Sequence, residues 1–203
     1  METAIPWNMN LFQLINVSDA PNAAVVLIAK GFALYAPWMV IGVLILFWLF
    51  GTVDKRRSLM IAGVALGLGL AVNFSIAFAI YVPRPFELGV GNTIFAHSLE
   101  TSFPSDHATF LWSLGFGLLA TRPLRQLGVI VFGLGLATAW ARVYLGVHFP
   151  LDMAASFVIS LLAAVLARTV AGKLDGVFFQ PVERINAILF GALRRTRKKA
   201  DGR

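Results

Sequence analysis

The chain contains 203 residues, of which 58% are hydrophobic and only 13% are charged, with a mean hydropathy of +0.78. This composition excludes an ordinary soluble globular domain and indicates a polytopic membrane protein. The chain has no cysteine, which excludes disulfides, thiolate metal sites and cysteine nucleophiles.

Residues 1–30 are expected to form an interfacial segment at the membrane surface. No basic stretch precedes an apolar core within residues 1–22, so no signal peptide is expected. Apolar residues in this segment recur at helical spacing, as in Trp7, Leu11, Leu14 and Ile15. Such spacing predicts a helix with one apolar face.

Five apolar stretches then follow, compared with the ~20 residues that a bilayer core of ~30 Å requires. They run over 31–50, 58–82, 105–121, 124–142 and 150–172, and the third is close to the lower limit. The expected fold is therefore all-α: one membrane domain over residues 1–203, with about five to six transmembrane helices. Residues 175–203 are expected to form an amphipathic helix and a basic tail.

The basic residues are distributed unevenly between the two ends of these stretches. With the N-terminus outside, 14 of the 17 Lys and Arg residues flank the inner ends, and only Lys30, Arg84 and Arg142 remain outside. Cytoplasmic anchoring therefore accounts for the net charge of +7, and no nucleic-acid partner is expected. All three histidines fall on the outer side or at its edge, which predicts a polar site on the extracytoplasmic face.

Arg142, His148 and Asp152 lie in an apolar run, where each charge costs ~2.5–3.5 kcal/mol at the centre of a membrane helix. Pro150 favours the first turn of a helix, so the last span is expected to begin near His148 with Asp152 about one turn further in. A carboxylate at that place holds one imidazole nitrogen and leaves the other as a nucleophile. The alternative is a His and an Asp that only satisfy each other at a helix end.

A second polar cluster is Pro104-Ser105-Asp106-His107, directly before an apolar run. Ser105 is expected to be an N-cap, and the free amides behind it favour a phosphate. His107 in the first turn is a candidate general acid. The alternative is an ordinary helix cap with an interfacial histidine.

A third cluster is Pro83-Arg84-Pro85, at the outer end of the second apolar stretch. The Arg84 and Arg142 guanidinium groups suit phosphate oxygens, although either alone also fits a headgroup anchor. Together the three clusters supply what phosphoryl transfer needs without a metal or another cofactor. Zinc is not expected, because His97 has no ligand spacing to the other histidines.

These residues resemble the type 2 phosphatidic acid phosphatase superfamily, which also includes vanadium haloperoxidases. Its second block, Pro-Ser-x-His, matches 104–107, and its third matches Arg142 to Asp152, with Ala141 in place of a serine. The resemblance implies that His148 is the nucleophile, Asp152 its partner and His107 the acid. Arg84, Arg142 and Ser105 would hold the phosphate.

The first block of that superfamily is matched only in part. Arg84-Pro85 is present, but Ala77 stands where the superfamily has a lysine. Asn73, one turn earlier, is the candidate substitute for this missing phosphate ligand. His97 and Glu100 lie in the loop before the second block, with roles in gating or water positioning as one hypothesis and a solvated loop as the other.

The finer resemblance is to the short bacterial undecaprenyl-diphosphate phosphatases linked to bacitracin resistance. It implies a bacterial inner-membrane enzyme that recycles the cell-wall lipid carrier and meets a polyprenyl diphosphate on its outer face. Alternatives are another lipid phosphate (phosphatidate, phosphatidylglycerophosphate, lipid A), a phosphotransferase with the same intermediate, a haloperoxidase, or a non-enzymatic lipid transporter. The sequence does not predict the oligomeric state.

Overall fold

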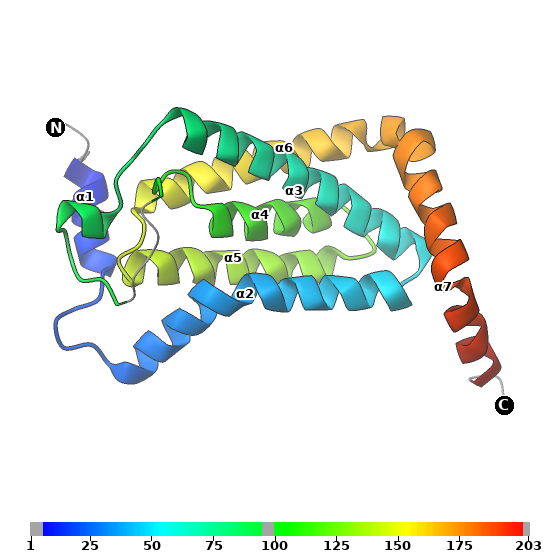
Figure 1. Cartoon of the computed structure of the whole chain (residues 1–203), viewed down its shortest axis with the longest axis horizontal. Helices are drawn as coiled ribbons and strands as arrows, with labels where there is room; N and C mark the ends of the chain where they lie inside the picture. Colours follow the sequence, from blue (N-terminus) through cyan, green and yellow to red (C-terminus); the bar gives the residue numbers. More distant parts are fainter. Residues whose placement is uncertain (1–5, 95–99, 201–203) are drawn as a thin grey trace.

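The computed structural model describes residues 6–94 and 100–200, with side chains described up to residue 190. Within these ranges the regular elements are all helices (Figure 1). They are α1 (Pro6–Ile15), α2 (Ala23–Phe50), α3 (Val53–Ala79), the short 3₁₀ helix η1 (Pro85–Leu88), α4 (Asp106–Leu119), α5 (Arg125–Tyr144), α6 (Pro150–Leu174), the π-helical turn η2 (Asp175–Phe179) and α7 (Gln180–Ala200). The predicted all-α fold is confirmed.

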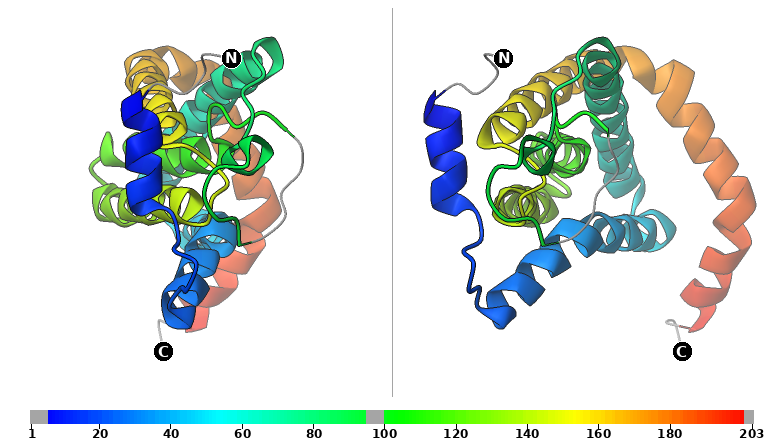
Figure 2. Two further views of the ribbon diagram at one scale, coloured as in Figure 1. Left: turned by 90° about the vertical axis from the view of Figure 1, so that its left-hand side faces the viewer. Right: turned by 60° about the vertical axis from the view of Figure 1, so that its left-hand side comes forward.

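Helix α4 is the centre of the bundle and packs against α3, α5 and α6 (Figure 1). Small residues bring these helices close together. A Cβ placed on Gly117 of α4 would lie 2.7 Å from the Ala62 Cα of α3, so only glycine permits this approach. Helix α2 packs mainly on α5, and α7 leaves the bundle at a steep angle (Figure 2, right).

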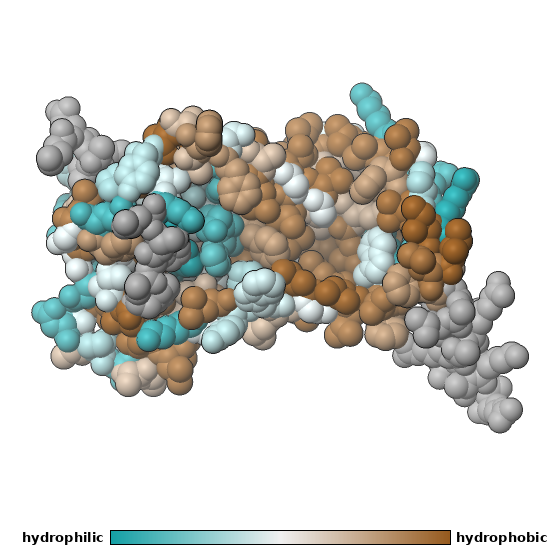
Figure 3. Space-filling model, in the orientation of Figure 1, coloured by the Kyte–Doolittle hydropathy of each residue, from teal (hydrophilic) through white to brown (hydrophobic). Residues whose placement is uncertain are grey.

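Four of the described helical segments are long and apolar enough to cross a membrane: α2, α3, α5, and the continuous segment that begins with α6. Their lipid-facing side chains form the apolar band across the middle of the molecule in Figure 3, while hydrophilic groups gather at the end that holds α1. Helix α4, predicted as the third and shortest of five spans, has only 14 residues. It is tolerated at this length because three longer helices surround it.

Helix α1 lies across the end of the bundle where α5 ends and α6 begins. Its Asn8 side chain accepts a hydrogen bond of 2.9 Å from the Leu151 backbone amide, and so caps the first turn of α6. Phe12 is fully buried against Phe149, with 5.1 Å between ring centroids. Trp7 and Leu14 remain exposed on the other face, as expected for a helix with one apolar side turned outward.

Candidate active site

The turn between α5 and α6 brings Arg142 and His148 together. Arg142 lies in the last turn of α5, and the chain reverses at Gly146, whose φ of 80° is in the left-handed region. A Cβ on Gly146 would lie 2.2 Å from the Asn92 carbonyl oxygen, so this turn requires glycine. His148 then lies two residues before Pro150, the first residue of α6, so this helix begins near His148 as predicted.

One ring nitrogen of His148 is held by hydrogen-bond acceptors. Its Nδ1 lies 2.8 Å from the Ser102 carbonyl oxygen and 3.2 Å from the Asp152 Oδ2 atom. The same Oδ2 accepts hydrogen bonds from the Phe149 amide at 2.8 Å and from the Ser102 hydroxyl at 2.5 Å. These acceptors assign the proton to Nδ1, and the lone pair is therefore on Nε2.

The other ring nitrogen, Nε2, faces two guanidinium groups. It lies 3.2 Å from Arg84 Nη1 and 3.1 Å from Arg142 Nη2. All three side chains are at most 3% exposed, so they interact in surroundings with little water. A ring nitrogen with its lone pair beside two guanidinium groups suits a phosphoryl group, because the guanidinium groups can bind its oxygens while the nitrogen faces phosphorus.

Arg84 is fixed mainly by backbone carbonyl groups. Its Nη1 donates to Val147 O at 3.0 Å, its Nε to Glu100 O at 3.0 Å and its Nη2 to Thr101 O at 3.2 Å. Burial lowers the pKa of the Arg84 guanidinium, and the carboxylates of Asp106 and Asp152 offset part of this effect. The Arg84 guanidinium group therefore connects the loop before η1, where Arg84 lies, to the loop before α4 and to His148.

The N-terminus of α4 supplies the second predicted cluster. Ser105 is its N-cap, as predicted, and the Ser105 hydroxyl accepts from the Ala108 amide at 3.5 Å. The Ser105 carbonyl accepts a 2.9 Å hydrogen bond from Ser156 of α6, which ties the start of α4 to α6. His107 Nδ1 lies 2.8 Å from Asp106 Oδ1, so this carboxylate orients the ring. The role of His107 as an acid stays a prediction.

A lateral groove leads from His107 into the apolar side of the bundle. One cavity of about 240 Å³ is lined by His107 and Asp106 together with residues of α2 and α3, among them Trp38 and Phe74. A second cavity of about 320 Å³ shares Ile41 and Phe110 with the first and continues along the same two helices. The two cavities form an apolar groove between α2 and α3, with one end at the polar site.

The side chain of Asn73 contacts α4 and, among the residues that the structure describes, makes no hydrogen bond to Arg84 or Arg142. Its side chain is buried in α3 and donates a 2.9 Å hydrogen bond to Thr109 Oγ1 on α4. Its proposed contact with phosphate stays a prediction, as does any compensation for Ala77. His97 lies outside the described residues, and Glu100 is exposed, with its carbonyl oxygen on Arg84.

Two residues that sequence analysis did not single out contribute to the site. Ser102 contacts both His148 and Asp152 through its hydroxyl and its carbonyl oxygen. Glu87 accepts hydrogen bonds from the Arg84 amide at 2.6 Å and from the Tyr81 hydroxyl at 2.5 Å. In the sequence, Ser102 could have been noted as a hydroxyl residue two positions before Pro104-Ser105. Glu87 could have been noted as an acidic residue three positions after Arg84.

Comparison with known proteins gives the same assignment. The model of the PAP2 superfamily matches residues 58–175. The chain is 28% identical to the protein YbjG of Escherichia coli (strain K12) over 189 residues, which are 90% of this chain and 92% of YbjG. It is 32% identical to the undecaprenyl-diphosphatase BcrC of Bacillus subtilis (strain 168) over 124 residues, or 61% of this chain and 63% of BcrC.

Among solved structures, the crystal structure of LpxE from Aquifex aeolicus is similar in fold, with a TM-score of 0.68. The likeness covers 82% of this chain and 96% of LpxE at 24% identity, so it supports the fold alone. The family match covers more than half of the chain and contains every predicted catalytic residue. The chain is therefore a multi-pass membrane enzyme that belongs to the PAP2 superfamily of phosphatases.

Proposed function

We propose that this protein hydrolyses undecaprenyl diphosphate to undecaprenyl phosphate and inorganic phosphate through a phosphohistidine at His148. The observation that carries the proposal is the split environment of the His148 ring. Nδ1 is occupied by Ser102 and Asp152, while Nε2 faces Arg84 and Arg142. The name of BcrC, a relative at 32% identity, supports the choice of substrate.

In the first step the Nε2 lone pair attacks the terminal phosphorus, and an N–P bond forms as the bond from phosphorus to the bridging oxygen breaks. His107 gives a proton to that oxygen, so undecaprenyl phosphate leaves. Arg84, Arg142 and the amides behind Ser105 bind the charge that develops on the phosphoryl oxygens. The His148 ring becomes positively charged in this step, and the Asp152 carboxylate stabilises it.

In the second step a water molecule attacks phosphorus. His107 accepts the proton of that water, the N–P bond breaks, and inorganic phosphate leaves with His148 neutral again. His107 thus acts as an acid in one step and as a base in the next. No step requires a metal ion.

The α2–α3 groove supports a lipid substrate with a long apolar tail. It ends at His107, which donates to the leaving group, and its walls are apolar side chains such as Ile41 and Phe110. With its apolar tail in this groove, the lipid would place its diphosphate at the start of α4 while the tail stays in the bilayer. The basic residues at the opposite end of the bundle support an extracytoplasmic orientation of the site in a bacterial inner membrane.

The test is to follow phosphate release by the purified protein from undecaprenyl diphosphate, phosphatidate and phosphatidylglycerophosphate. We expect the highest kcat/KM with undecaprenyl diphosphate, and a higher value with either other lipid would reassign the substrate. Release without an added alcohol separates a phosphatase from a phosphotransferase.

A second experiment addresses the intermediate. His148→Ala is expected to lower turnover by at least ~10³-fold while substrate still binds. Brief reaction of the wild type with substrate labelled in the terminal phosphate should leave an acid-labile label on the protein, absent from the His148→Ala variant. Equal labelling of both proteins would place the intermediate on another residue.

A further inference from the structure

A second group of arginines lines a cavity at the end of the bundle opposite His148. The cavity has a volume of about 380 Å³ and lies where α3 begins, α4 turns into α5 and α6 nears its end. Its polar lining comprises Asp54, Arg57, Ser58, Thr121, Arg122 and Arg168. Three arginines from three separate parts of the chain and one carboxylate residue therefore line this cavity.

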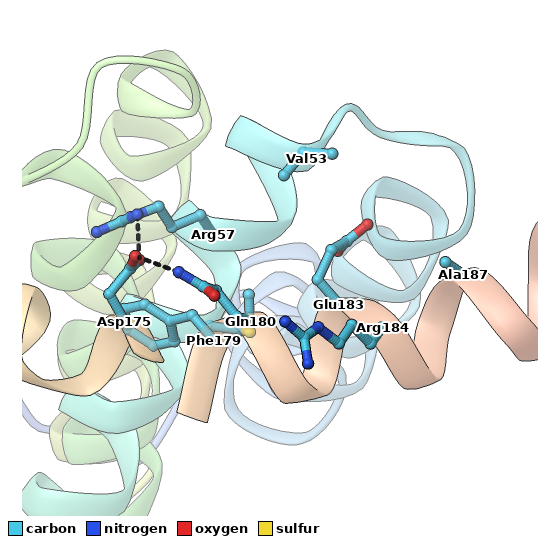
Figure 4. A pocket seen from close by; sticks show the side chains of 9 residues that line it. Val53, Arg57, Asp175, Phe179, Gln180, Glu183, Arg184 and Ala187 are labelled. Atoms are coloured by element: carbon cyan, nitrogen blue, oxygen red, sulfur yellow. Dashed lines mark hydrogen bonds and ion pairs between the residues drawn. The ribbon is translucent and has the colours of Figure 1, made fainter. Parts of the chain in front are cut away.

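The pairing of these charges is incomplete. Arg57 forms an ion pair with Asp175, which also accepts a hydrogen bond from Gln180 (Figure 4). Arg122 and Arg168 make no ion pair or hydrogen bond through their side chains with any residue that the structure describes. With Arg57 neutralised by Asp175, the cavity still holds two unpaired cations against the Asp54 carboxylate.

An adjacent cavity at this end of the bundle holds less unpaired positive charge. It has a volume of about 350 Å³ and is lined by Arg57, Arg184, Asp175 and Glu183, of which Arg57 and Asp175 form an ion pair (Figure 4). Glu183 is in turn paired with the buried Arg56. Arg184 is therefore the one cation lining that cavity without an ion pair among the described residues, compared with two in the cavity that contains Arg122 and Arg168, which is thus better suited to an anion.

We propose that this cavity binds the phosphate headgroup of an anionic phospholipid on the membrane face opposite the catalytic site. Basic pockets between transmembrane helices on the cytoplasmic side of a membrane suit such headgroups, and a guanidinium group matches the phosphate oxygens. Helix α5 begins two residues after Pro123, which lines the cavity, and its N-terminus has no side-chain cap. Its dipole adds to the attraction for a negative group.

Topology alone does not explain the arrangement. The positive-inside rule accounts for the number of basic residues at this end, but it does not predict which of them line a common cavity. Arg125 illustrates this difference, because it is exposed like Arg122 and Arg168 and lies close to Arg122 in the chain, yet it does not line the cavity. Arg125 is therefore the matched control for Arg122 and Arg168.

The experiment measures retention of phosphatidylglycerol by the full-length protein with native mass spectrometry, with phosphatidylcholine as the neutral comparison. The double variant Arg122→Gln/Arg168→Gln is expected to bind phosphatidylglycerol roughly 10- to 30-fold more weakly than wild type, because each substitution removes the electrostatic attraction of one arginine for the anionic headgroup. Arg125→Gln is expected to match wild type. Thermal unfolding of each variant checks that the fold is retained.

Equal retention of phosphatidylglycerol by the double variant and the wild type would overturn the proposal. Inorganic phosphate provides the second arm, in protein reconstituted with phosphatidylcholine alone. Saturable binding of phosphate that the double variant loses, together with no preference for phosphatidylglycerol, would also overturn it, because the ligand of this cavity would then be a free anion. The His148 site is intact in every variant, so this test is independent of the proposed substrate.

Discussion

Replacing Ser102 by alanine removes one hydroxyl from behind the nucleophile and leaves every group in front of it. The Ser102 Oγ atom donates to Asp152 Oδ2 at 2.5 Å and lies 3.3 Å from His148 Nδ1. Asp152 would keep the Phe149 amide, and His148 would keep the Ser102 carbonyl oxygen. The variant therefore loosens the carboxylate without removing it, which makes Ser102 a positioning residue.

The expected loss follows from the strength of that hydrogen bond. A hydrogen bond to a charged group contributes ~1.5–3 kcal/mol. At ~1.4 kcal/mol for each factor of ten, kcat should fall ~10- to 100-fold. KM should stay close to the wild-type value, because the hydroxyl lies on the Nδ1 side of the ring and the phosphate is expected on the Nε2 side.

The assay is steady-state phosphate release over a range of substrate concentrations, which separates kcat from KM. Ser160→Ala is the matched control, since its hydroxyl is also fully buried and donates to the Thr109 carbonyl at 3.2 Å. This control should lose thermal stability and retain kcat. A Ser102→Ala enzyme with wild-type kcat, or an equal loss of kcat in both variants, would refute the positioning role.

Three further predictions concern the metal, the groove and the missing lysine. Activity should survive EDTA, and its loss on chelation with rescue by one metal ion would contradict the phosphohistidine scheme. Ile41→Trp should fill the α2–α3 groove and raise KM for the polyprenyl substrate but not for a short-chain diphosphate, whereas equal effects on both would remove the groove from substrate binding. Asn73→Ala should raise KM if its amide binds phosphate, and lower stability with unchanged KM would limit Asn73 to its bond with Thr109.

The sequence predicted a helical bundle with its polar clusters at one end, because the residue types in each cluster indicate where a helix begins. Pro150 marked the start of α6 and Ser105 the cap of α4, as the structure confirms. Helix limits were less accurate. Helix α2 begins at Ala23 rather than near 31, because Asn22 caps it. The predicted apolar stretch starts after Lys30, but a charged residue interrupts the hydropathy pattern without interrupting the helix.

The contacts of Ser102 could not be predicted, because they join positions 46 and 50 residues apart in the chain. Nothing in a local pattern distinguishes a serine that meets a distant carboxylate from one that faces solvent. The same holds for the carbonyl groups that hold Arg84, since backbone atoms carry no sequence signal. Residue types predicted which groups the site contains, and tertiary structure determines which ring nitrogen of His148 faces the two arginines.

The short length of α4 explains how a charged site can exist at the end of an apolar bundle. With 14 residues, α4 is ~21 Å long, and so shorter than the ~30 Å hydrocarbon core. The Ser105 carbonyl meets Ser156, six residues into α6, which places the start of α4 ~9 Å below the start of α6. The N-terminus of α4 therefore lies in a recess between longer helices, where its free amides and Arg142 are withdrawn from bulk water. In such surroundings their interaction with a phosphoryl group is strong, and the recess opens sideways along α2 and α3, where a lipid would enter.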